Sequence, residues 1–151
     1  MSRFEQWLDG AGLGVTVMRF PAGTRTAVDA ARAVGCEVSQ IVKSLVFLAA
    51  GRPVVALVSG ANRLDEARFA NVAGEPVAKA DAEAARVATG YAIAGVPPFG
   101  HATDLPVFMD RDLFEHQVVW CAAGRPDAVF EISPERLREL SGATVVDLKA
   151  P

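Results

Sequence analysis

Apolar and polar positions recur with two different periods along the chain, and these periods predict an α+β fold. A helical period marks the segments SRFEQWLDGAG, TRTAVDAARAVG, LDEARFA, DAEAARVATG and SPERLRELSG. Alternating or continuous apolar residues mark strands at VTVMRF, IVKSLVFLAA, GRPVVALVSG, PVFMD, QVVWCAA, DAVFEIS and TVVDL. These segments do not alternate regularly enough for a doubly wound parallel sheet. We therefore expect one domain, residues 1–151, with helices packed against a mixed, largely antiparallel sheet.

The alanine-rich helix in TRTAVDAARAVG has a predictable buried side. Val28, Ala31 and Val34 are spaced to form one stripe along it. Gly35 follows the last turn, where glycine is typical of a C-cap. We expect the stripe to face the core.

One cation interrupts the apolar run at residues 41–50. In a strand, Lys43 shares a face with Ile41, Leu45 and Phe47. Lysine is almost never fully buried unless it is paired. Since the chain uses twelve arginines but only three lysines, a lysine here is unusual for this sequence. Lys43 therefore either reaches solvent at a strand end or faces a site that needs a positive charge.

The segment GYAIAGVPPFGHATDLP, residues 90–106, predicts a shaped loop. It contains three glycines and three prolines, which do not favour a helix. Pro97 and Pro98 stiffen the central part, GVPPFGH, so that its backbone N–H groups could be held at fixed positions for an oxyanion. A rigid surface turn explains the same composition.

The pentapeptide AAGRP occurs at residues 49–53 and 122–126, each time between two apolar strands. Gly51 and Gly124 can adopt the positive φ that a hairpin turn requires. Two similar hairpins explain the repeat better than an internal duplication, which would need more matching residues.

Composition excludes several classes of protein. Hydrophobic residues make up 51% of the 151 residues, charged residues 22%, and the net charge is −3, so the chain is not a polycation that binds nucleic acid through its overall charge. No apolar run approaches the roughly 18 residues of a membrane span, and the first ten residues lack the apolar region of a signal peptide. We expect a cytoplasmic protein with no membrane or DNA partner.

Common catalytic and metal-binding motifs are missing from the sequence. Cys36 and Cys121 are far apart and form no CxxC motif, so we expect reduced thiols and no zinc site. There is no GxGxxG after a strand, no Walker A motif, no GxSxG and no HExxH. We therefore expect no metal and no cofactor.

A few isolated polar residues remain as candidates. Ser44 lies in a predicted strand, where a serine is usually structural. His101 and His116 flank the strand PVFMD and could lie near each other or far apart. Asp110 ends that strand and is a candidate N-cap for a helix beginning at RDLFE.

Several motifs together resemble the YbaK/EbsC family, the free-standing relatives of the editing domain inserted in bacterial prolyl-tRNA synthetase. They are IVKSLVFLAAGRPVVALVSGANRLD, TGYAIAGVPPFGH, LPVFMDRDLF and WCAAGRPDAVFEISPERL. The resemblance runs from about residue 15 to the end. It implies a mixed sheet curled toward a barrel, with helices around it. It also implies hydrolysis of the ester between a wrong amino acid and the 3′ end of a tRNA.

The resemblance implies roles for individual residues. Lys43 and Asp110 correspond to the residues tied to deacylation, Lys43 by holding the acceptor end of the tRNA and Asp110 by shaping the site. Residues of the aminoacyl pocket and its surroundings are assigned to substrate binding: Ser44, Gly95, Val96, Pro97, Pro98, Phe99, Gly100, His101, His116 and Gly124. Many relatives have Gly-Gly before the loop where this chain has Ala94-Gly95, so its pocket could be narrower.

The function implied is trans-editing: a deacylase that removes a small amino acid from mischarged tRNA, with tRNA(Pro) as the expected substrate. Prolyl-tRNA synthetase is a possible partner. The alternative is a non-catalytic module that binds tRNA ends or a synthetase. The acidic balance of the chain argues against strong independent affinity for RNA.

Overall fold

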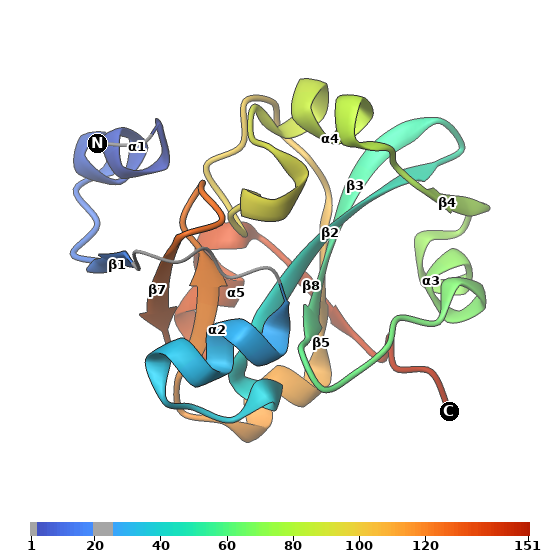
Figure 1. Ribbon diagram of the computed structural model, residues 1–151. Helices are drawn as coiled ribbons and strands as arrows, with labels where there is room; N and C mark the ends of the chain where they lie inside the picture. The colour runs from blue at the N-terminus through green and yellow to red at the C-terminus, as the bar shows by residue number, and fades with distance from the viewer. Residues whose placement is uncertain (1–2, 20–25) are drawn as a thin grey trace.

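The computed structural model describes residues 3–19 and 26–151, and Figure 1 shows the arrangement of their helices and strands. The helices are α1 (Arg3–Ala11), α2 (Ala27–Val34), α3 (Glu66–Ala73), α4 (Ala82–Thr89) and α5 (Pro134–Ser141). The strands are β1 (Val17–Arg19), β2 (Val42–Ala49), β3 (Arg52–Ser59), β4 (Val77–Lys79), β5 (Val107–Asp110), β6 (Val119–Ala122), β7 (Ala128–Ile132) and β8 (Thr144–Val146). Short 3₁₀ helices lie between these elements: η1 (Val38–Gln40), η2 (Ile93–Gly95) and η3 (Arg111–Glu115). None of these described helices is long and apolar enough to cross a membrane.

The strands form two sheets. One has the order β4-β2-β3-β5-β8 and the other the order β1-β7-β6. Within the larger sheet β2 pairs antiparallel with β3 and β4, whereas β3, β5 and β8 are parallel neighbours. The smaller sheet is antiparallel throughout. The predicted α+β class with a mixed, largely antiparallel arrangement is therefore confirmed.

The expectation of a single curled, barrel-like sheet is not supported. An isolated parallel bridge between Ile41 and Trp120 links the two sheets, and neither of the described sheets closes on itself. The reason lies at the β2 edge. Strand β4 pairs only with residues 47–49, and residues 41–45 of that edge line a pocket beside β6. The pairing that begins with the Ile41–Trp120 bridge is therefore not continued along β2 and β6, and the two sheets remain separate.

The main core lies between the two sheets. Val46 and Val55 of the larger sheet and Phe130 of the smaller sheet belong to it, together with Phe4 of α1. A second apolar cluster covers the outer face of the larger sheet, where Phe69 of α3 is fully buried. Figure 1 places α1 and β1 at one end of the molecule and α3 with the C-terminus at the other.

Helix α2 buries Ala31 of the predicted stripe but leaves Val28 exposed. Ala30 and Ala31 are its buried residues, and they pack against Ile41 and the partly buried Trp120. Val28, which was expected to face the core, is 49% exposed. The prediction was wrong at this position because the small alanines, rather than the valines, let the helix lie close to the strands. Gly35 is the C-cap, as predicted.

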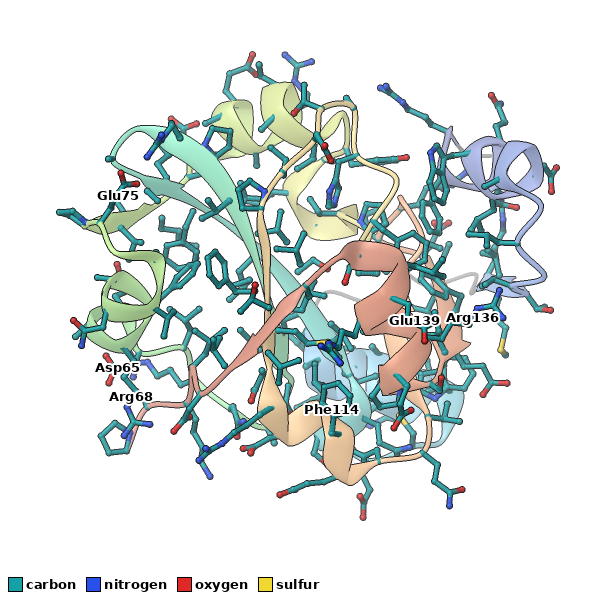
Figure 2. The ribbon with its side chains drawn as sticks, turned by 180° about the vertical axis from the view of Figure 1, so that it is seen from behind. Asp65, Arg68, Glu75, Phe114, Arg136 and Glu139 are labelled. Atoms are coloured by element: carbon teal, nitrogen blue, oxygen red, sulfur yellow. The ribbon has the colours of Figure 1, made fainter. Side chains whose placement is uncertain are left out.

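The C-terminal segment closes the outer face of the larger sheet. Asp65 caps α3 with its carboxylate, and its backbone N–H donates to the carbonyl of Leu148 at 2.8 Å. Arg68, next to Asp65 in Figure 2, donates to Asp147 at 2.7 Å. These contacts hold Leu148 in the second apolar cluster.

Candidate functional site

A pocket of about 530 Å³ lies between the start of α2, the first half of β2, η2 and the turn from β6 to β7. Its size is within the range of small-ligand pockets. The lining is mostly apolar, and its charged side chains are Lys43 and Arg125. We call it the Lys43 pocket.

Lys43 lies near the start of β2, opposite Val58 of β3. Its ammonium donates a hydrogen bond of 2.6 Å to the backbone carbonyl of Asn62. No ion pair joins Lys43 to a carboxylate in the part of the chain that the structure describes. Burial lowers the pKa of Lys43, and the negative charge of Asp110 partly opposes this. The site therefore holds a half-buried cation that no contacting carboxylate neutralises.

Asp110 is fully buried at the end of β5 and does not line the pocket. Its carboxylate accepts hydrogen bonds from the Ser59 N–H at 3.1 Å, the Asn62 side-chain amide at 2.9 Å and the Asp112 N–H at 3.0 Å. The last bond caps η3, as the sequence predicted. The Asn62 amide also donates to the Asp112 carboxylate at 2.9 Å. We call Lys43, Asn62, Asp110 and Asp112 the polar network.

The proline-containing loop is part of the core rather than a surface turn, since residues 95–99 are all buried. Among residues 95–101, the pocket lining includes only Val96. Gly95 lies directly against the β6–β7 turn: a Cβ at this position would be 2.8 Å from the Arg125 Cα. Only glycine permits this approach, so the loop and the turn form one continuous wall.

The far end of the loop faces a second pocket, of about 290 Å³, which Pro98, Phe99, Gly100 and His101 line together with Trp7. The Nε2 atom of His101 lies 2.7 Å from the Pro97 carbonyl oxygen. A carbonyl can only accept, so the ring carries its proton on Nε2. Burial lowers the pKa of His101. The predicted loop residues are therefore divided between two pockets.

Aromatic side chains from distant segments pack behind the loop and the β6–β7 turn. We call them the aromatic cluster: Phe4, Trp7, Tyr91, Phe99 and Phe130. The ring of Phe4 lies 5.4 Å from that of Phe130 and 5.6 Å from that of Phe99, between centroids. Gly124 has a φ of +87°, and a Cβ there would come within 2.7 Å of the Phe4 Cβ. Helix α1 thus supports the same wall from behind.

Two further residues of the pocket lining have informative surroundings. The Ser44 hydroxyl is buried and has no hydrogen-bond partner among the described residues. Cys121 is buried, and burial raises the pKa of its thiol. The thiol is therefore neutral at physiological pH and a poor nucleophile.

His116 lies apart from both pockets. It is partly buried at the end of η3, where its N–H donates to the Leu113 carbonyl at 3.4 Å. Within residues 3–19 and 26–151, no group of three or more His, Cys, Asp or Glu side chains is placed to hold a metal ion.

The sequence did not single out Asn62 or Arg125. Asn62 contacts Lys43 through its backbone carbonyl, and no residue pattern predicts such a contact. Arg125 belongs to the repeated AAGRP, which was interpreted only as turn chemistry. Its guanidinium forms a two-bond pair with Asp127, with distances of 3.0 and 3.1 Å.

The chain is similar to known proteins over most of its length. A family described as the aminoacyl-tRNA editing domain matches residues 21–140. The uncharacterized protein YwhH of Bacillus subtilis (strain 168) is 32% identical over 130 residues, which cover 85% of this chain and 83% of that protein.

Two other similarities concern prolyl-tRNA synthetase. A proline–tRNA ligase of Solidesulfovibrio magneticus is 34% identical over 93 residues, which are 60% of this chain but only 16% of the ligase. A crystal structure of a protein proposed to be a trans-editing enzyme for prolyl-tRNA synthetase superposes with a TM-score of 0.93. The two chains are 46% identical, and the match covers 100% of this chain and 99% of that one.

Proposed function

The chain belongs to the aminoacyl-tRNA editing domain family, as its motifs predicted, and we propose that it is a trans-editing deacylase. It hydrolyses the ester that joins a wrongly attached small amino acid to the 3′ end of a tRNA, with tRNA(Pro) as the expected substrate. The observation that carries this proposal is the Lys43 ammonium, half-buried at a small-ligand pocket and not in contact with any described carboxylate.

Lys43 binds a phosphate of the terminal adenosine. Hydrogen bonds from a cation to a phosphate are short and strong because both partners are charged. An ammonium that is partly removed from water binds an anion more strongly than an exposed one does, because the local dielectric constant is lower. Lys43 therefore fixes the acceptor end so that the ester reaches the apolar part of the pocket.

The loop supplies a backbone donor to the ester carbonyl. Pro97 and Pro98 have no N–H, and the Gly95 N–H already donates to the Ala92 carbonyl at 2.8 Å. Phe99 and Gly100 line the second pocket. Val96 is therefore the loop residue whose N–H we assign to the developing oxyanion.

Water is the nucleophile. It forms a bond to the ester carbon, the bond from that carbon to the ribose oxygen breaks, and a proton of the water passes to the ribose oxygen. The neutral Cys121 thiol is unsuited to attack. We assign activation of the water to the neighbouring 2′-hydroxyl of the tRNA.

The pocket selects the amino acid mainly by size. Ala94 and Val96 line it, and the unpaired Ser44 hydroxyl offers a hydrogen bond to a polar group of the substrate. An apolar pocket discriminates by only about 10- to 200-fold per methylene group. Overlapping substrates are therefore expected, with alanine, serine, cysteine and threonine as candidates.

The substrate also defines the setting in which the protein works. A deacylase of this kind acts on aminoacyl-tRNA in the cytoplasm. A synthetase could supply the affinity for tRNA that a chain of net charge −3 lacks. Residues 1–151 act as one editing domain in this proposal.

The test is a panel of tRNA(Pro) charged with alanine, serine, cysteine, threonine or proline, in which loss of the labelled ester is measured against the buffer rate. The wild-type protein is expected to hydrolyse at least one of the wrong esters and to spare prolyl-tRNA. Lys43→Ala should lower the rate by about 100-fold or more, as loss of a charge-stabilising group does, without changing the circular dichroism spectrum.

Lys79→Ala is the matched control, because Lys79 is an exposed lysine on β4, away from the pocket. A folded Lys43→Ala protein with wild-type activity would contradict the role of Lys43. If no ester is hydrolysed above the buffer rate while the tRNA still binds, the chain is a non-catalytic binding module.

A further inference from the structure

Asn62 connects the pocket cation to the buried acidic residues. Its backbone carbonyl accepts from Lys43 at 2.6 Å, and its side-chain amide donates to Asp110 and Asp112, each at 2.9 Å. Its own N–H donates to the Ser59 carbonyl at 2.9 Å. Asn62 is thus bound through its backbone and its side chain at the same time.

We propose that Asn62 is the positioning residue for Lys43: its amide, held between the carboxylates of Asp110 and Asp112, fixes the carbonyl that aims the ammonium. This inference rests on the proposed function for its meaning in catalysis, but the contact itself exists without substrate.

The location of Asn62 explains why a turn can hold this carbonyl in place. Strands β3 and β5 are parallel, so their carboxyl ends meet at one edge of the sheet. Asp110 ends β5 and also binds the N–H of Ser59, the last residue of β3. The turn that carries Asn62 leaves β3 at this point. Because Asp110 is fully buried, this end of the anchor lies in the core.

The chemistry of position 62 favours an amide. When ionised, both neighbouring carboxylates can accept hydrogen bonds but cannot donate them. An amide nitrogen can donate to both. An aspartate at 62 would bring a third carboxylate against them. An alanine would remove a donor from the buried Asp110, which is costly for a buried charge.

The arrangement also leaves the cation available to a ligand. An ammonium has several N–H donors, and the Asn62 carbonyl accepts one of them. A carbonyl carries no net charge, so it orients Lys43 without cancelling its charge. Asp110 acts on Lys43 through its charge but forms no ion pair with it among the described residues.

The first experiment is a double-mutant cycle on the deacylation rate. Asn62→Ala should lower kcat/KM by about 10- to 100-fold, the scale of a displaced catalytic group. In a Lys43→Ala background the same change should have no further effect, because the residue acts only through Lys43. Asp112→Ala removes one of the two acceptors from a partly exposed position and should give a smaller loss in a protein that folds normally.

The second experiment needs no substrate. In ¹H–¹⁵N spectra of the lysine side chains, the hydrogen-bonded Lys43 ammonium should be protected from exchange with water, in contrast to Lys79 and Lys149, which are both exposed. Asn62→Ala and Asp112→Ala should reduce this protection. Asn71→Ala is the matched control, since Asn71 is exposed on α3 and should change neither readout.

Two results would overturn the proposal. One is an unchanged Lys43 signal in folded Asn62→Ala and Asp112→Ala proteins. The other is an equal loss of activity from Asn62→Ala with and without Lys43, which would show a merely structural role. If the wild-type protein hydrolyses no ester while the Lys43 signal responds as expected, the proposed function fails and the positioning of Lys43 by Asn62 stands.

Discussion

The two walls of the Lys43 pocket are built in opposite ways. On one side the polar network fixes a single cation through a few directional hydrogen bonds at the end of the larger sheet. On the other side the aromatic cluster supports the loop and the β6–β7 turn mainly by packing, with one hydrogen bond from the Tyr91 hydroxyl to the Gly100 carbonyl at 3.1 Å. Substitutions in the polar network and in the aromatic cluster should therefore affect activity and stability differently.

The difference follows from the energies involved. A hydrogen bond contributes only about 0.5–1.5 kcal/mol net, whereas truncating a buried aromatic side chain costs about 3–5 kcal/mol. Changes at Lys43 should therefore reduce activity with little effect on stability. Changes in the aromatic cluster should reduce stability first and activity as a consequence.

The largest stability effect is expected for Phe4→Ala. Phe4 is fully buried and contacts the rings of Phe99 and Phe130. Its truncation should lower the free energy of unfolding by about 3 kcal/mol or more, measured by denaturant titration. Val87→Ala is the control, because Val87 is 66% exposed on α4 and should stay within about 0.5 kcal/mol of the wild type. Equal stability of the two variants would show that α1 does not support the pocket.

A smaller stability effect with a clear loss of activity is expected for Gly95→Ala. The added methyl would lie 2.8 Å from the backbone of Arg125, so the loop or the turn must move. Overpacking of this kind costs about 1–3 kcal/mol, and a displaced Val96 should lower the deacylation rate by about tenfold or more. The measurements are unfolding and deacylation in parallel.

Gly14→Ala controls for the loss of a glycine as such. A Cβ at Gly14 would meet nothing within 4 Å, so this variant should match the wild type in both assays. If Gly95→Ala also matches it, the close contact between loop and turn is not needed for the site.

The sequence predicted local structure well where a residue type has a specific structural role, such as capping a helix. Gly35 ends α2 with a positive φ, and Asp110 caps η3 through the Asp112 N–H, both as expected from the sequence. The sequence also singled out Lys43 as a candidate, because a cation in an apolar strand requires an explanation, and its side chain lines the pocket.

The sequence could not predict contacts that depend on how distant segments meet. Every residue has a backbone carbonyl, so the sequence does not distinguish that of Asn62 from the others. Only the fold brings it to Lys43. The division of the loop between two pockets depends on where α1 packs, since Trp7 of that helix lines one of them. The buried side of α2 was mispredicted at Val28 for a similar reason: the neighbouring strands decide which side of a short helix is covered.

The smallest expected effect concerns acid stability at the far end of the loop. Burial lowers the pKa of His101 in the folded protein below its ordinary value of 6.5. The unfolded chain therefore binds a proton more readily, and stability should be complete above pH 6.5 and fall as the pH decreases toward the folded pKa. His101→Gln keeps a donor for the Pro97 carbonyl without a titrating ring, so its stability should fall less between pH 6.5 and pH 5 than that of the wild type. Urea titrations at several pH values would measure this difference, with His116→Gln, at a histidine that lies apart from both pockets, as the comparison variant. Parallel pH curves for the wild type and His101→Gln would show that burial beside the second pocket does not hold His101 neutral.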